Sequence, residues 1–329
     1  MKSIRSIKAL TILAGCVFVL FLCGESQAKM QLQMPLGGVQ GSFYMIGAAV
    51  AKYVNEHSDK IVVTPNTSGG GVENSRRVSQ GVAHLGMTMP ETMYQSWNGV
   101  APFKEKMRNW KVVGVTTKVM ADHTVTLAKY NIKTIEDVKG HIFAIGAPGS
   151  GAAVGMALFL EHTGLDKNID IRKLPHKDYP TMLLDGKIHV FNRLGAVPAA
   201  VVEQVAVQKK IALVDFRAMI EKSRFFEKYP YYQKVSVPGG TYKGEDRDIT
   251  FFGSAGFFIA RADLPDDIVY EFTRLAYSDG CIKSVGMVFK GHNLNRETPF
   301  AGNIGPVHPG AAKFWKEVGV AVPESMLKE

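Results

Sequence analysis

Residues 141–164 read HIFAIGAPGSGAAVGMALFLEHTG, a short apolar run followed by a Gly-rich segment and a second, longer apolar run. The first run, 141–145, predicts a strand. The Gly-rich segment 146–151 predicts a tight turn, and the following run predicts a helix that ends near Gly164. A strand, a turn and a helix therefore follow one another here.

The same order of elements occurs earlier in the chain. The predicted elements are a strand over 30–34, a turn over 36–41, a helix with Ser42 as its N-cap candidate, a strand over 61–64, a Gly-rich turn over 67–71 and a short helix over 72–80. Short helices that end at Gly81 and Gly186 occupy matching places in the two halves. We therefore predict two related β-α-β-α halves with parallel sheets, and an α/β fold of two lobes with a cleft between them.

The last third of the chain predicts a strand-like stretch over 250–259 and a helix that begins near Pro265. The segments 118–127 and 250–258 are the candidates for two strands that cross between the lobes and form a hinge. The predicted division is residues 29–122 plus 252–329 for lobe 1 and residues 123–251 for lobe 2.

The first 28 residues predict an export signal. Lys2, Arg5 and Lys8 precede an almost uncharged apolar stretch, and small residues stand before Lys29, as at a cleavage site. Two alternatives stay open, a retained membrane anchor and lipid attachment at Cys16, whose preceding residues resemble a lipobox. The expected location is periplasmic.

Composition excludes disordered, fibrous and coiled-coil proteins. The 329 residues are 46% hydrophobic and 21% charged, which is typical of a globular chain. The formal net charge is +9, but the basic residues are scattered, whereas a nucleic-acid-binding surface shows a stripe of them. A positive field that attracts small anions is one interpretation, and a generally basic surface is the other.

Catalytic motifs are missing from the sequence. The nine His residues lack metal-binding spacing, and those at 57, 123, 162, 176 and 292 are predicted at the surface or at helix ends. Cys281 is predicted to be a small buried residue, and Ser150 does not stand in a G-x-S-x-G motif. No phosphate-binding P-loop or dinucleotide motif is present. We predict no catalytic residue, no metal site and no cofactor.

Three Gly-rich turns, over 37–42, 68–74 and 146–152, lead into predicted helices. The first N–H groups of a helix have no partner within it, and the helix dipole adds a partial positive charge. Such turns can bind a carboxylate, and Ser42, Asn74 and Ser150 could add hydrogen bonds. The alternative is that these glycines only permit tight turns.

Two charged residues stand at the ends of predicted inner strands. Arg193 could hold a carboxylate with its planar guanidinium, or it could form a salt bridge between the lobes or lie in solvent. Glu91 could accept a hydrogen bond from a ligand amine or hydroxyl, or it could pair with Arg193 or Arg76.

Several motifs together resemble the TAXI-type extracytoplasmic solute-binding proteins of tripartite ATP-independent periplasmic (TRAP) transporters. The motifs, in chain order, are Gly41-Ser42-Phe43-Tyr44, Gly70-Gly71-Val72-Glu73-Asn74, the turn 146–151, Asp185-Gly186-Lys187-Ile188, Ala262-Asp263-Leu264-Pro265 and Pro306-Val307-His308-Pro309-Gly310-Ala311. The resemblance spans nearly all of the chain after the signal.

The resemblance implies a type II periplasmic-binding-protein (Venus-flytrap) fold that closes on a small, acidic organic solute and presents it to membrane permease subunits. The residues that it carries to the ligand site are Ser42, Phe43, Tyr44, Asn74, Gly149, Ser150 and Gly151, together with Gly41 of the first motif. The chain departs from the family pattern at His189 and Glu91, where Asp is common, and at Arg193, where small or apolar residues are common. Carboxylates, dicarboxylates and acidic amino acids are the expected ligands.

The expected protein is thus a monomeric, non-enzymatic subunit of a TRAP transporter with no nucleic-acid partner. Two other functions use the same cleft: a periplasmic sensor that reports its ligand to a membrane kinase, and an exported enzyme.

Overall fold

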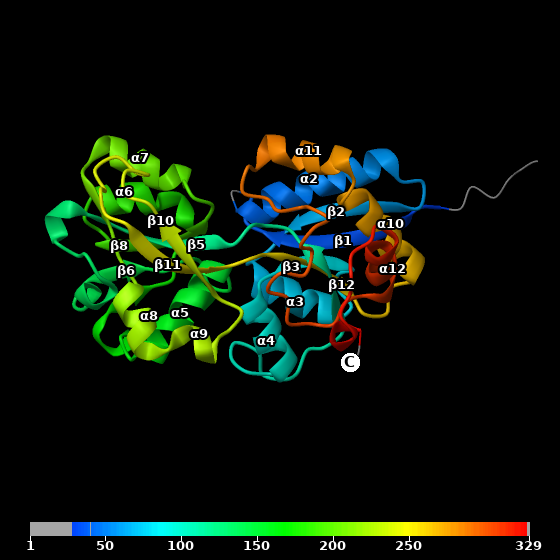
Figure 1. The fold of residues 1–329 in the computed structure, drawn as a ribbon, viewed down its shortest axis with the longest axis horizontal. Coiled ribbons are helices and arrows are strands. Elements are labelled where there is room, and N and C mark those ends of the chain that lie inside the picture. Colours follow the sequence, from blue (N-terminus) through cyan, green and yellow to red (C-terminus); the bar gives the residue numbers. More distant parts are fainter. Residues whose placement is uncertain (1–27, 40, 328–329) are drawn as a thin grey trace, which may run out of the picture.

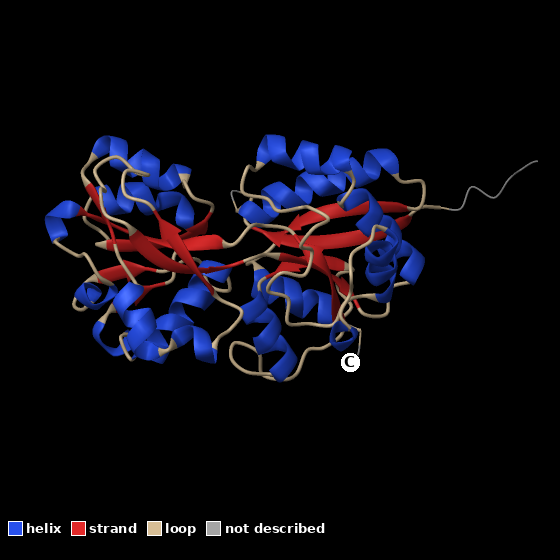
Figure 2. Cartoon of the chain, viewed as in Figure 1, coloured by secondary structure: helices blue, strands red, loops and turns tan. Residues whose placement is uncertain are grey.

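The computed structural model describes residues 28–39 and 41–327, which form two lobes side by side (Figure 1). The predicted signal, its anchor alternative and the lipid site at Cys16 lie outside the described residues. In each lobe, helices cover both faces of a β-sheet layer (Figure 2). Within the described ranges, no helix is both long enough and apolar enough to cross a membrane. The predicted fold class, an α/β fold of two lobes, is confirmed.

Lobe 1 contains the N-terminal and C-terminal parts of the described chain (Figure 1). Its strands are β1 (Met30–Gly37), β2 (Ile61–Thr67), β3 (Leu85–Thr88), β4 (Trp110–Val115) and β12 (Phe257–Arg261). Its helices are α2 (Ser42–His57), α3 (Gly71–Ser79), α4 (Pro90–Asn98), α10 (Asp266–Ala276), α11 (Asp279–Val288) and α12 (Pro309–Glu317), with a final turn η5 (Glu324–Met326). Strands β1 and β2 pair in parallel, whereas β12 lies between β3 and β4 and pairs antiparallel with both.

Lobe 2 contains the middle of the chain. Its strands are β5 (Met120–Leu127), β6 (Ile142–Ala144), β7 (Asp170–Arg172), β8 (Val190–Gly195), β9 (Ile211–Leu213), β10 (Gln233–Val237) and β11 (Ile249–Ser254). Its helices are α5 (Gly151–Thr163), α6 (Tyr179–Leu184), α7 (Ala200–Gln208), α8 (Arg217–Ser223) and α9 (Phe225–Lys228), with short 3₁₀ turns η1 (Ala128–Tyr130), η2 (Ile135–Val138), η3 (Asp166–Asn168) and η4 (His176–Asp178). The sheet order is β10-β11-β5-β8-β6-β7, and β9 also pairs with β5.

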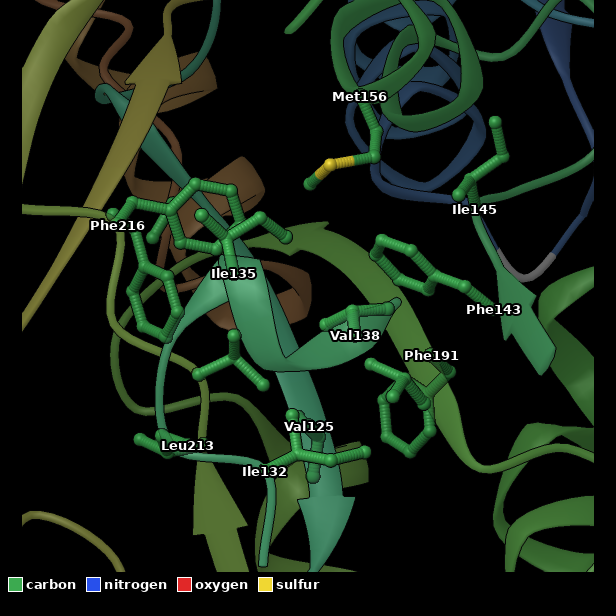
Figure 3. Packing of buried hydrophobic residues seen from close by; sticks show 14 of the residues in the cluster. Val125, Ile132, Ile135, Val138, Phe143, Ile145, Met156, Phe191, Leu213 and Phe216 are labelled. Carbon is green, nitrogen blue, oxygen red and sulfur yellow. The ribbon is translucent and has the colours of Figure 1, made fainter. Parts of the chain in front are cut away.

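Aromatic side chains in the core of lobe 2 hold helix α5 in place. Phe159 of α5 stacks on Phe252 of β11 at a ring distance of 5.1 Å and meets Phe225 of α9 edge to face at 4.9 Å. Figure 3 shows Phe143 of β6 and Phe191 of β8 packed beneath Met156 of α5. Burying side chains of this size contributes about 1.5–3 kcal/mol each, so these contacts hold α5 in place.

Two strands join the lobes. Near the junction β5 and β11 run antiparallel, with Met120 opposite Ser254 and Ala121 opposite Gly253, and the chain then passes into β12 of lobe 1 (Figure 1). A Cβ atom at Gly253 would lie 2.0 Å from the Met120 carbonyl oxygen, so this close crossing requires glycine. The predicted division at 122/123 and 251/252 falls within these strands, and both that division and the hinge stay predictions.

Several local predictions are wrong in detail. The N-cap of α2 is Gly41, and Ser42 is the first helical residue. The stretch 250–259 is two strands, β11 and β12, that belong to different sheets. Parallel pairing describes β1 with β2 and β6 with its neighbours, whereas the other strand pairs are antiparallel. Pattern alone did not show that β12 would pair antiparallel with both β3 and β4. Cys281 is fully buried, as predicted.

Candidate functional site

A cavity of about 620 Å³ lies between the lobes. Its lobe 1 wall is formed by Leu36, Gly37, Gly38, Val39, Gly41, Ser42, Phe43, residues 68–71 and Met89. Its lobe 2 wall is formed by Met120, Ala147, Ser150, Gly151, Ala152, Pro175, His176, Lys177, Pro180, Arg193, Leu194, Ala200, Val201 and Gln204. The volume lies within the range of about 300–1,000 Å³ that is typical of small-molecule sites.

All three predicted Gly-rich turns reach this cavity. In the first, the Gly41 N–H donates to the Gly38 carbonyl at 2.7 Å, and α2 then begins at Ser42. In the second, Gly70 has φ +107° at the N-cap of α3, a conformation that side chains rarely adopt. In the third, Ser150 is the N-cap of α5, and its hydroxyl oxygen accepts from the Ala153 N–H at 3.3 Å. The N-termini of these three helices line the cleft, as the spacing of the turns predicts.

A fourth helix N-terminus was not predicted. The first residues of α7, Ala200 and Val201, line the lobe 2 wall together with Gln204. No Gly-rich turn precedes α7, so the pattern that identified the other three helices was missing. Residues at or beside the N-termini of α2, α3, α5 and α7 thus line one cavity.

Arg193 lies in β8, opposite His123 of β5, and its side chain lines the cavity. Within the described residues its guanidinium makes no hydrogen bond or ion pair, so the predicted alternative of a salt bridge between the lobes is wrong. Burial lowers the pKa of Arg193 from its ordinary value. Arginine nevertheless remains charged at neutral pH, so the wall carries an unneutralised cation.

His176, at the start of η4, lines the cavity beside this cation. Burial and the Arg193 charge lower the pKa of His176 to about 3, so its ring is neutral at physiological pH. Its Nδ1 atom is buried and has no hydrogen-bond partner among the described residues. The prediction of a surface or helix-end position agrees with the place of His176 at the start of η4 but is wrong for His123, which is fully buried in β5. Neither residue stands in a motif that indicates its place at the cavity or in the core.

The floor of the cavity is apolar. Met89 of lobe 1 packs with Met120, Ala152 and Leu194, and Phe43 packs against the same cluster. No Asp or Glu belongs to the lining formed by the described residues. The cavity can therefore accommodate an anionic group and an uncharged body.

Four predicted site residues do not line the cavity. Asn74 is fully buried, and its side-chain amide donates to the carbonyl oxygens of Leu36 at 3.1 Å and Met87 at 2.7 Å. Gly149 contacts the other lobe through its carbonyl oxygen. Tyr44 packs beside the core of lobe 1, and Glu91 is buried. Of the ten predicted residues, the structure brings together at the cavity Gly41, Ser42, Phe43, Ser150, Gly151 and Arg193.

Glu91 lies beneath the cavity at the junction of the lobes. It is 1% exposed and accepts a hydrogen bond from the Ser254 hydroxyl at 3.3 Å, rather than pairing with Arg193 or Arg76. Burial raises its pKa to about 8. The buried carboxyl of Asp122 also has a raised pKa, and it accepts from the Asn192 side-chain amide at 2.8 Å. Two buried acids thus lie behind the site.

The lobes also touch at one edge of the cavity. The Val72 N–H, in the first turn of α3, donates to the Gly149 carbonyl at 3.4 Å. A Cβ atom at Gly70 would lie 3.2 Å from that same oxygen and 3.2 Å from the Ser150 Cα atom. Two of the Gly-rich turns therefore meet backbone to backbone.

The two α/β lobes and the cavity between them define the fold that two-lobe substrate-binding proteins share. The chain belongs to the NMT1-like family, whose model matches residues 35–319.

Solved structures share the fold at low sequence identity. A Bordetella bronchiseptica protein aligns with a TM-score of 0.52 and 15% identity, covering 90% of this chain and 86% of its own. A binding protein component of an ABC phosphonate transporter from Pseudomonas aeruginosa aligns with 0.51 and 9%, covering 81% and 82%. A structure described for glutathione import in Streptococcus mutans aligns with 0.50 and 12%, covering 80% and 96%. Two of these structures are described together with ABC transporters. Membership of this chain in the TAXI subfamily therefore stays a prediction.

Proposed function

We propose that this protein is the exported solute-binding subunit of a membrane transporter and that it captures a small organic anion. The observation that carries the proposal is the unpaired guanidinium of Arg193 in a cavity whose described lining contains no acid. Arg193 is half-buried, and a cation that is partly removed from water without a partner loses hydration that nothing replaces. An anionic ligand would neutralise it, and the N-termini of α2, α3, α5 and α7 would supply N–H donors.

Capture would proceed by closure of the lobes. The solute would bind first to one wall, and rotation about β5 and β11 would then bring the other wall onto it and exclude water. Residues of both lobes line the cavity, so the closed form buries more of the ligand than either lobe does alone. A permease that contacts both lobes could distinguish the closed protein from the open one.

The finer proposal is a TRAP transporter of the TAXI type, with a periplasmic monomer that delivers a carboxylate, dicarboxylate or acidic amino acid. It rests on the motifs quoted from the sequence. Reconstitution with TRAP permease subunits tests it, because solute uptake should need an ion gradient and no ATP. Uptake that requires ATP hydrolysis would place the protein with an ABC permease.

Titration calorimetry and thermal shift of the purified protein test the capture of an anion. A ligand present at about 100 times its dissociation constant adds about 2.7 kcal/mol to the free energy of unfolding. We expect Arg193→Ala to weaken binding by about 30-fold or more, because charged hydrogen bonds contribute about 2 kcal/mol or more when buried. The matched control is Arg172→Ala, since Arg172 is exposed on β7 and pairs only with Asp170 in the described chain. Equal affinities in the two variants would contradict the proposed role of Arg193.

A further inference from the structure

The ionisable groups of the cavity are all on one side. Arg193, His176 and Lys177 belong to lobe 2. The lobe 1 wall is built from Leu36, Val39, Phe43 and Met89 with glycines and serines, and none of its described residues has an ionisable side chain. The two walls therefore suit different ends of one molecule.

The charges in the cavity favour one enclosed anionic group. Arg193 is the less exposed of the two cations, since it is half-buried and burial lowers its pKa, whereas Lys177 is exposed. A second carboxylate against the lobe 1 wall would lose its hydration and would meet no compensating cation. The helix N-termini there offer N–H donors, which uncharged oxygens also satisfy.

The described lining also lacks a carboxylate that could pair with an ammonium. The buried carboxyl groups of Glu91 and Asp122 lie outside the lining. Both are fully enclosed and have raised pKa values, so Glu91 carries little negative charge at neutral pH and Asp122 is shifted in the same direction. A free amino acid would therefore leave its positive charge unpaired beside Arg193.

His176 adds a polar contact at the charged end. Its buried Nδ1 atom has no partner among the described residues, and the ring is neutral because of burial and Arg193. A neutral imidazole nitrogen makes one hydrogen bond, as a donor or as an acceptor according to its tautomer. Either the acid group or an adjacent hydroxyl or oxo group can satisfy it.

We infer that the ligand is an organic monoanion, a monocarboxylate or monosulfonate, with its acid group on Arg193 and His176 and an uncharged, mainly apolar body against Leu36, Val39 and Phe43. This inference rests on the proposed function and narrows it, because the sequence resemblance implied dicarboxylates and acidic amino acids. A cavity of about 620 Å³ has room for such a body.

Matched pairs of acids test the inference by calorimetry on the whole purified protein. Hexanoate and adipate have the same carbon chain and differ by one carboxylate, and hexanesulfonate and L-glutamate extend the comparison. We expect hexanoate or hexanesulfonate to bind at least tenfold more tightly than adipate and L-glutamate. Adipate or L-glutamate binding as tightly as the best monoanion would overturn the inference and leave the proposed function standing. Binding of none of these acids, with no organic anion found by native mass spectrometry, would overturn both.

A pair of variants tests where the body lies. Val39 lines the cavity and Val82 does not, yet both side chains are 58% exposed, so neither substitution disturbs a core. Val39→Lys places a cation at the apolar wall and should raise the affinity for adipate relative to hexanoate by about threefold or more, the effect of a partly exposed ion pair. Val82→Lys should leave that ratio unchanged. An unchanged ratio in Val39→Lys would overturn the placement of the body on lobe 1.

Discussion

The Nε2 atom of His123 lies 2.8 Å from the phenolic oxygen of Tyr242, deep in lobe 2. The same oxygen accepts the Ala199 N–H at 2.8 Å, at the N-cap of α7. The Nδ1 atom of His123 donates to the Ala121 carbonyl at 3.1 Å, so Nε2 of the neutral ring accepts from the Tyr242 hydroxyl. The pair therefore fixes the start of α7, which forms part of one wall of the cavity. His123 also stands opposite Arg193 in the strand pairing.

Tyr242→Phe is expected to destabilise the protein and to weaken ligand binding. The change leaves the Ala199 N–H and the His123 ring nitrogen buried without partners, which costs about 2–4 kcal/mol. Urea unfolding measures the loss, and Tyr94→Phe is the control because the Tyr94 ring is 47% exposed. Tyr94→Phe should change the free energy of unfolding by less than about 0.5 kcal/mol. Equal stability of the two variants would contradict the role of Tyr242.

The raised pKa of Glu91 predicts that the free energy of unfolding falls as the pH rises. Its pKa is raised from 4.5 to about 8 in the folded protein, so between these values the folded state holds more protons than the unfolded state. The free energy of unfolding should therefore decrease by roughly 1 kcal/mol per pH unit across this window, and the penalty should be complete above about pH 8. Asp122, Tyr231 and Tyr232 face the same region and resist a negative charge there.

Glu91→Gln isolates this effect from other titrations. The amide keeps the shape of the side chain and cannot ionise, so the variant should gain stability over the unmodified protein at pH 8 and lose that advantage below about pH 5. Denaturant unfolding at several pH values measures the difference between the two proteins. A difference that does not vary with pH would show that Glu91 titrates normally.

Asn74→Ala tests a residue that shapes the cleft from behind. The variant leaves the carbonyl oxygens of Leu36 and Met87 without their donor and removes the acceptor of the Ser68 hydroxyl. We expect a loss of about 2–4 kcal/mol in stability and weaker ligand binding, because Leu36 and Ser68 line the cavity. Asn98→Ala, at an exposed amide that donates to Tyr94, should have little effect on either measurement.

Gly70→Ala is expected to impair both folding and closure. The φ of +107° is strained for alanine, and the added methyl group would press on Gly149 and Ser150 across the interface between the lobes. Gly164→Ala is the control, since φ is +70° but nothing lies within 4 Å of the added atom. Both variants should lose stability, and only Gly70→Ala should lose ligand affinity. Full affinity in Gly70→Ala would show that the two turns need not meet.

Short sequence patterns predicted the parts of the site that depend on neighbouring residues in the chain. Gly-rich turns before periodic apolar runs identified α2, α3 and α5, and a strand end identified Arg193. His176 and α7 could not be predicted, because they reach the cavity through the packing of lobe 2 and carry no turn motif. Asn74 and Glu91 are polar residues near a turn or a strand end, which is why the sequence predicts both as ligand contacts. In the structure both are buried against segments that are distant in the sequence. Asn74 supports the backbone of those segments through its hydrogen bonds, and Glu91 is an enclosed acid.

The middle strand of the sheet β3-β12-β4 is the last strand of the chain to be synthesised. As the chain leaves the ribosome, β3 and β4 emerge first and have no partner until residues 257–261 follow the whole of lobe 2. Lobe 2, by contrast, is complete once β11 has emerged. The order of synthesis thus lets lobe 2 fold first and leaves the sheet β3-β12-β4 of lobe 1 incomplete until β12 has emerged.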